Sequence, residues 1–420
     1  MIQFEKHTLN NGLRVIAHHD PSTPMAAFNL LYNVGARDEH PQLTGFAHLF
    51  EHLMFEGSVN IEGFDRHLHH AGGENNAFTT NDITNYYITL PAINLETAFW
   101  LESDRMLGLA FSEGKLAIQK NVVVEEFRQS YLNQPYGDTW LLLRPLAYQN
   151  HPYQWATIGK NIGHIQGASL GQVEDFFRTH YHPANAILAV SGNVKPGEVF
   201  RLAEKWFGDI PARPGNLRRL PAEPPQESER RLSVERDVPS SQLFMAFHCR
   251  ERMHPDFFAT DLLSDLLANG DSSRLIRRLV KEEKTCHEVN AYLTGSLDPG
   301  LFVVHAKLPA ETSPGQAEAA MWQELDRICE QEPDERELEK VKNKVEAAHT
   351  FSESHVLARA MNLAYYELMD EAGRLNRLMD FYKGVSSRDI SRLARETFRK
   401  ENVSVMHYLA AGAGKMANIG

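Results

Sequence analysis

The chain has 420 residues, of which 42% are apolar and 23% are charged, so it is long enough to form two or more domains with ordinary cores. Its formal net charge of −12 argues against nucleic acid or an anionic membrane as the main partner. The three cysteines are sparse, odd in number and without CxxC spacing, which argues against a disulfide framework and against thiolate metal ligands.

The first segments predict short strands. No basic stretch followed by an apolar one opens the sequence, and no apolar run approaches the ~18 residues of a membrane span. We therefore expect a cytoplasmic protein without a membrane segment, with the periplasm as the alternative if a leader has been removed. An Asn-Asn-Gly turn precedes a predicted strand at 13–17, and a second strand at 25–31 leads towards the next element.

The stretch 43–58, LTGFAHLFEHLMFEGS, has the pattern of a largely buried helix. The Thr-Gly pair near the start of this stretch is a helix-start signal, Gly57 near its end is a stop signal, and no proline lies between them. His48 and His52 are four residues apart, so one helical turn places both imidazoles on the same face. Glu51 leans towards that face as well. The stretch thus gathers two imidazoles and a carboxylate in apolar surroundings.

Two neutral imidazoles one turn apart can bind one divalent ion, and a carboxylate beside them can take a proton from an activated water. A pair of hydrogen-bonded core histidines is the alternative, and for a single histidine it would be preferred. The full HxxEH order is the inverse of HExxH and occurs in zinc hydrolases. The motif therefore predicts a zinc site with His48 and His52 as ligands and Glu51 as general base.

Further elements follow in chain order. Alternating residues predict a strand at 84–90, helical periodicity predicts helices at 95–107 and 113–131, and YHPANAILAV predicts a strand at 181–190 with a helix from Pro196. The segment 213–231 is rich in proline and unsuited to a helix or a central strand. We predict a first domain over 1–212, this segment as an extended linker, and a second domain over 232–420.

The two predicted domains repeat each other. Four short motifs of the first half recur in order in the second, at an offset that grows only from 214 to 222 residues, which indicates a duplicated domain. In the second copy DFFATDLLSDLLANG replaces the HxxEH helix, and Ala348 stands opposite Glu126. Only the first half therefore retains the metal ligands. The repeated motifs are Asn76-Ala77-Phe78, Leu90-Pro91-Ala92, Glu102-x-Asp104-Arg105 and Lys120-Asn121.

A catalytic zinc usually has three protein ligands, so one more is required. The predicted helix at 113–131 carries Glu125 and Glu126, which point about 100° apart, so only one can face the site. Val122, Val123 and Gln119 lie near the face of Glu126, which favours Glu126 over Glu125. Without the histidine motif, both would be read as solvated glutamates.

Together these features resemble the pitrilysin or insulinase-type peptidases, including the mitochondrial processing peptidases and their short bacterial relatives. The resemblance rests on HLFEH, AGGENNAFT, the glutamate helix, YHPANAILAVSGNV and the duplicated half. It implies an α+β fold of two duplicated α/β-sandwich domains, each a mainly antiparallel sheet covered by helices. It also implies one zinc ion per chain, with Glu126 as the third ligand.

The resemblance implies roles for further residues. The outer-shell glutamate of the family falls on Gln119, a departure that affects how the ligands are held. Asn76 and Ala77 would lie on an edge strand to which an extended peptide adds, although the residues alone indicate only a turn and a strand. Arg359 and Tyr366, seven residues apart in the second half, would hold the substrate carbonyl. In isolation they would be read as a solvated and a core residue.

The predicted function is that of a zinc metalloendopeptidase for extended oligopeptides or unfolded segments in a closed chamber. The resemblance implies a homodimer or a heterodimer with a related chain. Within metal hydrolysis, the alternatives are presequence cleavage and trimming of a peptide-derived cofactor precursor. Outside it, the alternatives are a non-catalytic scaffold subunit and a peptide-binding module.

Overall fold

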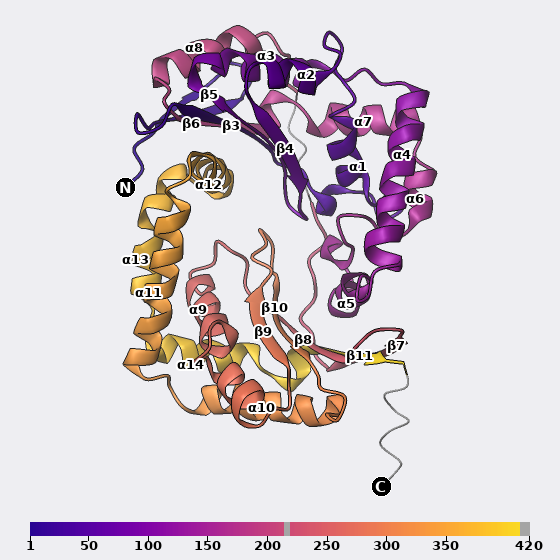
Figure 1. The fold of residues 1–420 in the computed structure, drawn as a ribbon, viewed down its shortest axis with the longest axis vertical. Coiled ribbons are helices and arrows are strands. Elements are labelled where there is room, and N and C mark those ends of the chain that lie inside the picture. The colour runs from indigo at the N-terminus through magenta and orange to yellow at the C-terminus, as the bar shows by residue number, and fades with distance from the viewer. Residues whose placement is uncertain (214–218, 412–420) are drawn as a thin grey trace. The chain divides into compact units, whose positions relative to one another are not determined.

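A computed structural model describes residues 1–213 and 219–411, and they divide into two compact units. Unit 1 consists of Met1–Ser130, Trp155–Pro221 and His349–Arg377, and unit 2 consists of Tyr131–Gln154, Ala222–Ala348 and Leu378–Gly420. Each unit has one sheet covered by helices (Figure 1). Within the described ranges no helix is both long and apolar enough to cross a membrane.

Unit 1 is built on a six-stranded mixed sheet with the order β1-β2-β6-β3-β5-β4. β2 and β6 are parallel, and the other neighbouring strands are antiparallel. β3 and β6 lie in the middle of the sheet and have buried residues along almost their whole length, whereas β4 lies at an edge. The strands are β1 (Glu5–Thr8), β2 (Arg14–His19), β3 (Met25–Tyr32), β4 (Glu74–Thr79), β5 (Thr84–Pro91) and β6 (Ala186–Gly192).

Helices cover both faces of this sheet. α3 and α8 pack on one face, and α12 packs on β2, β3 and β6 from the other (Figure 1). α1 lies beside the edge strand β4 and also contacts α4 and α7. The helices of unit 1 are α1 (Phe46–Leu53), α2 (Phe64–His70), α3 (Leu95–Leu107), α4 (Glu113–Phe127), α6 (Ile162–Gln166), α7 (Leu170–His180), α8 (Pro196–Phe207) and α12 (Val356–Met369).

Unit 2 repeats this plan with five strands in the order β7-β11-β8-β10-β9. β7 and β11 are its parallel pair, as β2 and β6 are in unit 1. Alternate residues of β8 point to opposite faces: Leu243, Met245 and Phe247 pack with α9, α10 and α14, while Phe244 and Ala246 pack with α5. The strands are β7 (Arg230–Arg236), β8 (Gln242–His248), β9 (Glu288–Leu293), β10 (Leu301–Lys307) and β11 (Val403–Ala410).

The helices of unit 2 complete the correspondence. α9 follows β8 as α1 follows β3, which confirms that DFFATDLLSDLLANG occupies the place of the HxxEH helix. The Asn-Ala-aromatic repeats lie on β4 and β9, which are edge strands of their respective sheets. The helices are α5 (Thr139–Ala147), α9 (Phe257–Ala268), α10 (Pro314–Glu330), α11 (Glu335–Ser352), α13 (Leu378–Lys383) and α14 (Ser387–Thr397).

Two corresponding helices exchange places between the units. α5 follows α4 in the first half of the chain but packs on β7, β8 and β11 of unit 2. α12 follows α11 in the second half but packs on β2, β3 and β6 of unit 1. The composition of the units therefore differs from the predicted 1–212 and 232–420, because 131–154 and 349–377 each belong to the other unit. Both are amphipathic helices that pack on equivalent strands of two similar sheets.

The predicted linker at 213–231 falls partly on 214–218, which lie outside the described residues. Residues 219–229 form neither helix nor strand, in agreement with their proline content, and the last two residues already belong to β7. The unit boundary lies between Pro221 and Ala222. The α+β architecture with two related sheets is as predicted.

Candidate metal centre

α1 places His48 and His52 on one face. Its other face buries Phe46, Leu49 and Phe50 against the interior of unit 1, so the helix cannot rotate without exposing apolar surface. The side chain of His48 is 13% exposed and that of His52 is 25% exposed. The imidazoles are thus held by a packed helix but remain accessible from one side.

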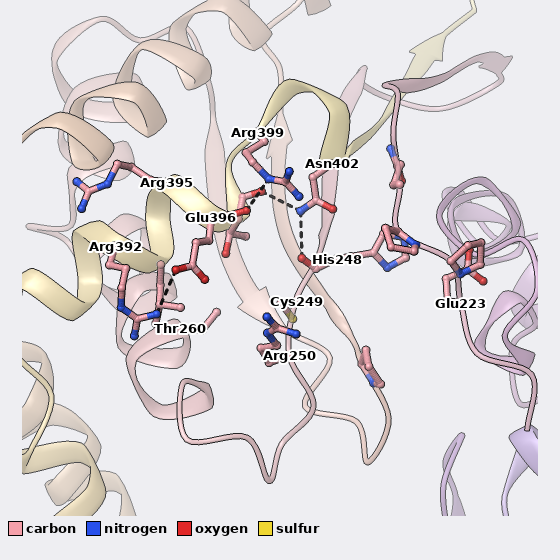
Figure 2. Close-up of a pocket in the computed structure, with 16 residues that line it drawn as sticks. Glu223, His248, Cys249, Arg250, Thr260, Arg392, Arg395, Glu396, Arg399 and Asn402 are labelled. Carbon is pink, nitrogen blue, oxygen red and sulfur yellow. Dashed lines mark hydrogen bonds and ion pairs between the residues drawn. The ribbon is translucent and has the colours of Figure 1, made fainter.

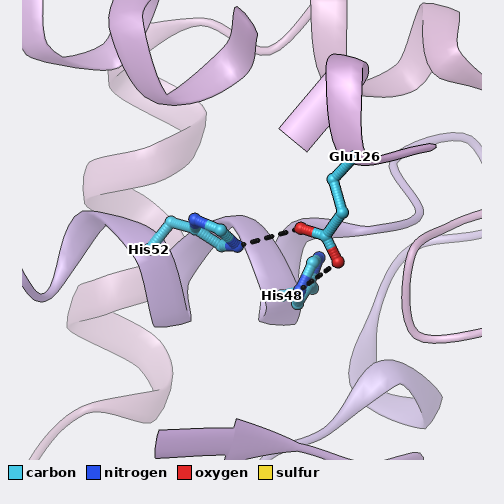
Figure 3. Close-up of side chains that lie close together, drawn as sticks. All are labelled: His48, His52 and Glu126. Atoms are coloured by element: carbon cyan, nitrogen blue, oxygen red, sulfur yellow. Dashed lines mark ion pairs between the residues drawn. The ribbon is translucent and has the colours of Figure 1, made fainter. Parts of the chain in front are cut away.

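α4 brings Glu126 to the two histidines. Its Oε1 lies 3.6 Å from Nε2 of His48 and its Oε2 lies 3.3 Å from Nε2 of His52 (Figure 3). One ligand atom of each of the three residues lies within 4.8 Å of the others. Two ligands of a tetrahedral zinc ion, at about 2.0–2.1 Å from the metal, lie about 3.3–3.4 Å apart. The two nitrogen–oxygen distances are close to this spacing, and two imidazoles with one carboxylate are donors that suit a zinc ion.

The electrostatics of the cluster favour the ligand forms of His48 and Glu126. Burial lowers the pKa of His48, and this effect outweighs the opposing attraction of Glu126. The hydrogen bond with His52 is the main cause that lowers the pKa of Glu126. A neutral imidazole and an ionised carboxylate are the states that bind a divalent cation.

Glu51 is anchored beside the cluster by the sheet. The hydroxyl of Thr79, the last residue of β4, donates a 2.6 Å hydrogen bond to Oε2 of Glu51. This contact fixes the carboxylate without using both of its oxygens. Thr79 was not identified from the sequence, although it stands three residues after Asn76 in the segment that carried the resemblance.

The register of α4 distinguishes the two adjacent glutamates. Glu125 points to solvent, with a side chain that is 53% exposed and pairs with Arg128 and Gln129. Glu126 faces the histidines, as predicted. One premise of that prediction was wrong: Val123 is buried, but Val122 is 43% exposed, so the buried stripe of α4 lies to one side of Glu126.

Gln119 lies two turns before Glu126 but does not contact the histidines through its amide. Its Nε2 donates to Oε1 of Glu56, which lies just beyond α1. The backbone carbonyl of Glu56 accepts a second hydrogen bond, from Nζ of Lys115. Gln119 therefore ties α4 to the end of α1. The side-chain amide of Gln119 therefore binds the segment that follows α1 and makes no hydrogen bond to His48 or His52.

The structure places Asn76 and Ala77 on β4, as expected for an edge strand. β5 pairs with one side of β4, and the six-stranded order leaves the other side without a neighbouring strand among the described residues. Side chains along β4 alternate between exposed and half-buried. The outer edge of β4 therefore has no neighbouring strand in the described part of the chain, and the N–H of Ala77 donates to Oδ1 of Asn76 at 2.8 Å.

Arg359 and Tyr366 lie on α12 and so belong to unit 1, not to the second domain as predicted. Nη1 of Arg359 lies 2.6 Å from Oδ2 of Asp20 and 2.9 Å from Nε2 of His18, at the end of β2. Tyr366 is 5% exposed. Arg359 thus has partners of its own within unit 1, and Tyr366 packs as a core residue.

A separate pocket of about 650 Å³ lies in unit 2, between the end of β8, α14 and residues 223–226 (Figure 2). Its arginines are largely paired: Arg392 binds Asp256 and Glu396, and Arg399 binds Glu401. None of the predicted site residues lines it. The chemistry of the candidate site thus lies elsewhere, at α1 and α4.

Comparisons with known proteins agree with this geometry. A family model described as "Insulinase (Peptidase family M16)" matches residues 14–159, and one described as "Peptidase M16 inactive domain" matches residues 167–345. The first contains His48, His52 and Glu126, and the second covers most of the half that lacks such a group.

Several relatives carry names of zinc proteases. The chain is 32% identical to "Zinc protease PqqE" of Helicobacter pylori over 311 residues, which are 72% of this chain and 69% of that protein. It is 26% identical to "Uncharacterized zinc protease YmxG" of Bacillus subtilis, over 72% of this chain and 73% of that one. It is also 25% identical to an Arabidopsis thaliana protein named "Probable mitochondrial-processing peptidase subunit beta", over 75% of this chain and 61% of that one.

Solved structures share the fold over nearly the whole chain. A protease from Helicobacter pylori superposes with a TM-score of 0.91 at 27% identity, covering 97% of this chain and all of that one. Pitrilysin superposes with a TM-score of 0.80 at 16% identity, covering 98% of this chain and 45% of that one, which shows a common fold. The chain therefore belongs to the insulinase family of peptidases, family M16.

Proposed function

We propose that this protein is a zinc-dependent endopeptidase that hydrolyses extended peptides. The observation that carries the proposal is the convergence of the imidazoles of His48 and His52 with the carboxylate of Glu126, beside the anchored carboxylate of Glu51. Two nitrogens and one carboxylate are a ligand set of catalytic zinc, which leaves a position for substrate and water. Relatives named as zinc proteases support the same metal.

Zinc bound there would lower the pKa of a water molecule and polarise the scissile carbonyl. The side chains supply the proton transfers. Glu51, with Oε2 held by Thr79, takes a proton on Oε1 from the attacking water and then passes it to the nitrogen of the leaving amine. The water oxygen forms a C–O bond with the carbonyl carbon as the O–H bond of water breaks; the C–N bond of the peptide then breaks, and the products are a carboxylate and a protonated amine.

The substrate is proposed to bind as an additional strand along the free edge of β4. Backbone groups near Asn76 and Ala77 would pair with the peptide and hold it in an extended form. Because Thr79 ends the same strand and binds Glu51, a peptide on this edge would be aligned with the general base. This mode recognises backbone, so it suits unfolded segments of varied sequence.

Arg359 is proposed to position the substrate carbonyl within an assembly of two chains, either a homodimer or a pair with a related chain; Tyr366, which the resemblance pairs with it, is only 5% exposed and supports α12 from the core of unit 1. Arg359 is bound to Asp20 within its own unit, so its orientation is already fixed before a partner or a substrate arrives. A relative named as a peptidase subunit supports a two-chain assembly. A closed chamber that admits only unfolded substrates is part of this proposal.

The test is hydrolysis of a mixed peptide library by the wild-type protein and by Glu51→Gln, each with and without a chelator. Only the wild-type protein without chelator is expected to cut, because the other samples lack the base or the metal. Glu51→Gln should retain its zinc, since Glu51 is not one of the three ligands. Equal cutting by both proteins would overturn the assignment of the base.

The alternative is a non-catalytic subunit of a two-chain peptidase. The contact of Gln119 with Glu56 instead of a histidine is the observation that favours it, since an outer-shell carboxylate normally orients such ligands. Zinc analysis of the purified protein separates the two functions. A peptidase should hold one zinc ion per chain, whereas a scaffold should hold none in stoichiometric amount.

A further inference from the structure

The N-terminus of α1 has no capping side chain of its own. The residue that precedes the helix is Gly45, which has φ +90° and no side-chain cap. The first N–H groups of a helix need acceptors, and Ser, Thr, Asp or Asn at this position usually supplies one. In α1 these N–H groups lie directly before His48. The group that accepts hydrogen bonds from them therefore also determines the position of the His48 imidazole.

Glu39 supplies the missing acceptor from outside the helix. Its Oε2 accepts from the backbone N–H of Gly45 at 2.8 Å, and its Oε1 accepts from that of Ala47 at 2.8 Å. The indole Nε1–H of Trp155 donates to Oε2 at 3.1 Å and to the carbonyl of Ala36 at 2.9 Å. Glu39 is 5% exposed, so no water competes effectively for these bonds.

The same end of α1 is confined by backbone from residues 158–160. A Cβ on Gly45 would lie 2.7 Å from the carbonyl oxygen of Ile158, and one on Gly159 would lie 2.8 Å from that of Thr44. The hydroxyl of Thr44 accepts from the N–H of Lys160 at 2.8 Å. The start of α1 therefore packs closely against the backbone of residues 158–160. This packing restricts both translation of α1 along its axis and rotation about it.

We infer that Glu39 is a positioning residue for the metal centre: its carboxylate fixes the N-terminus of α1 so that His48 and His52 meet Glu126. Both oxygens are required, because each accepts from a different N–H group of the same helix end. Trp155 holds the carboxylate in turn. Glu39 touches neither ligand nor substrate, so it acts only through the placement of α1.

The inference rests on the proposed zinc site, and Glu39→Gln tests it by metal binding. The amide keeps the size of the side chain but turns an N–H group towards a backbone N–H, so the end of α1 must shift. We expect zinc affinity, measured by competition with a chromogenic chelator, to fall about tenfold or more. The visible absorption bands of the Co²⁺-loaded protein should change in position or intensity, which reports ligand geometry independently of activity.

Leu202→Ala is the matched control. Leu202 is a buried residue of α8 in the same unit, so its truncation destabilises unit 1 without touching α1. Zinc affinity and the Co²⁺ spectrum of this variant should equal those of the wild type. If Leu202→Ala weakens zinc binding as much as Glu39→Gln does, the effect is general destabilisation and the inference is wrong.

Trp155→Phe provides a second route if Glu39→Gln does not fold. It removes the indole donor but leaves both hydrogen bonds that the start of α1 donates to Glu39, so a smaller decrease in zinc affinity is expected. If Glu39→Gln or, where that variant does not fold, Trp155→Phe binds metal as the wild type does, the inference is wrong while the proposed zinc site still stands. Failure of the wild-type protein to bind Zn²⁺ or Co²⁺ would instead overturn the proposed function, and the inference with it.

Discussion

The hydroxyl of Thr79 donates a 2.6 Å hydrogen bond to the carboxylate of Glu51, which joins the end of the edge strand β4 to the last turn of α1. Hydrogen bonds to charged groups contribute about 1.5–3 kcal/mol, so this contact can hold a general base in one orientation. It also places the strand proposed to bind the peptide in direct contact with the residue proposed to move the proton.

Replacing Thr79 by Val keeps the shape of the side chain and removes the donor. We expect kcat to fall about 10- to 100-fold with little change in KM, because the substrate still pairs with β4 while the base is less well oriented. Thr79→Ser should restore most of the activity. Steady-state kinetics on a quenched fluorescent peptide measures both, and a Thr79→Val enzyme with full kcat would contradict the proposed role.

Glu51→Gln should lose activity by about 10²- to 10⁴-fold, since the amide cannot accept the proton from water. Zinc content should stay at one ion per chain, because the two histidines and Glu126 are unchanged. The measurement pairs turnover of a peptide with metal analysis of the same sample. Loss of zinc together with activity would show that Glu51 acts on the metal and not as the base.

The adjacent glutamates of α4 offer a matched pair. Glu126→Gln should abolish stoichiometric zinc and activity, because it weakens one of three ligands, whereas Glu125→Gln should leave both unchanged because Glu125 is exposed and pairs with Arg128. His48→Ala should behave like Glu126→Gln. Metal analysis of the dialysed proteins checks this, and equal zinc loss in both glutamate variants would refute the assigned register.

Arg359 has a structural partner that allows its two possible roles to be separated. Arg359→Ala should lower kcat/KM at least about tenfold if its guanidinium positions the substrate carbonyl. Asp20→Asn removes the charge of its partner but keeps the guanidinium, so this variant should stay within about twofold of wild type. Equal losses in the two variants would indicate that Arg359 serves only to anchor α12 to β2.

The pH dependence of stability is expected to involve Glu318 in unit 2. Burial raises the pKa of Glu318, but hydrogen bonds with His407 and Arg231 outweigh it and lower this pKa to about 2. Because the folded pKa lies below the ordinary value near 4.5, the stabilisation is complete above about pH 5 and is lost as the pH falls towards 2. Urea unfolding at several pH values should show a smaller acid-side decline in Glu318→Gln than in wild type.

Much of the candidate site could be predicted from the sequence because helical spacing is a local property. The four-residue interval between His48 and His52 determines a shared face wherever the helix packs, and the adjacency of Glu125 and Glu126 on one helix shows that only one of them can face the site. The internal repeat likewise predicts a second, related sheet, since repeated motifs require repeated elements. These features depend on neighbours in sequence or on the comparison of one half with the other.

What could not be predicted depends on distant contacts. Nothing in the sequence around Glu39 shows that it accepts from α1 and from Trp155, which is 116 residues away. The exchange of α5 and α12 escapes prediction for a related reason: an amphipathic helix shows that it covers a sheet, but two sheets with the same strand order offer it equivalent surfaces. The sequence therefore predicted one boundary between two continuous domains. In the structure, each unit instead combines three separate segments of the chain.

The exchanged helices make the duplicated halves interdependent. A polypeptide ending before the linker would carry the zinc ligands but would leave β3 and β6 without α12, exposing an apolar surface of their sheet to water. The remaining half would lack α5 in the same way. Shortening the chain to the half that carries His48, His52 and Glu126 would therefore remove part of that half's own core, because α12 lies in the other half of the sequence.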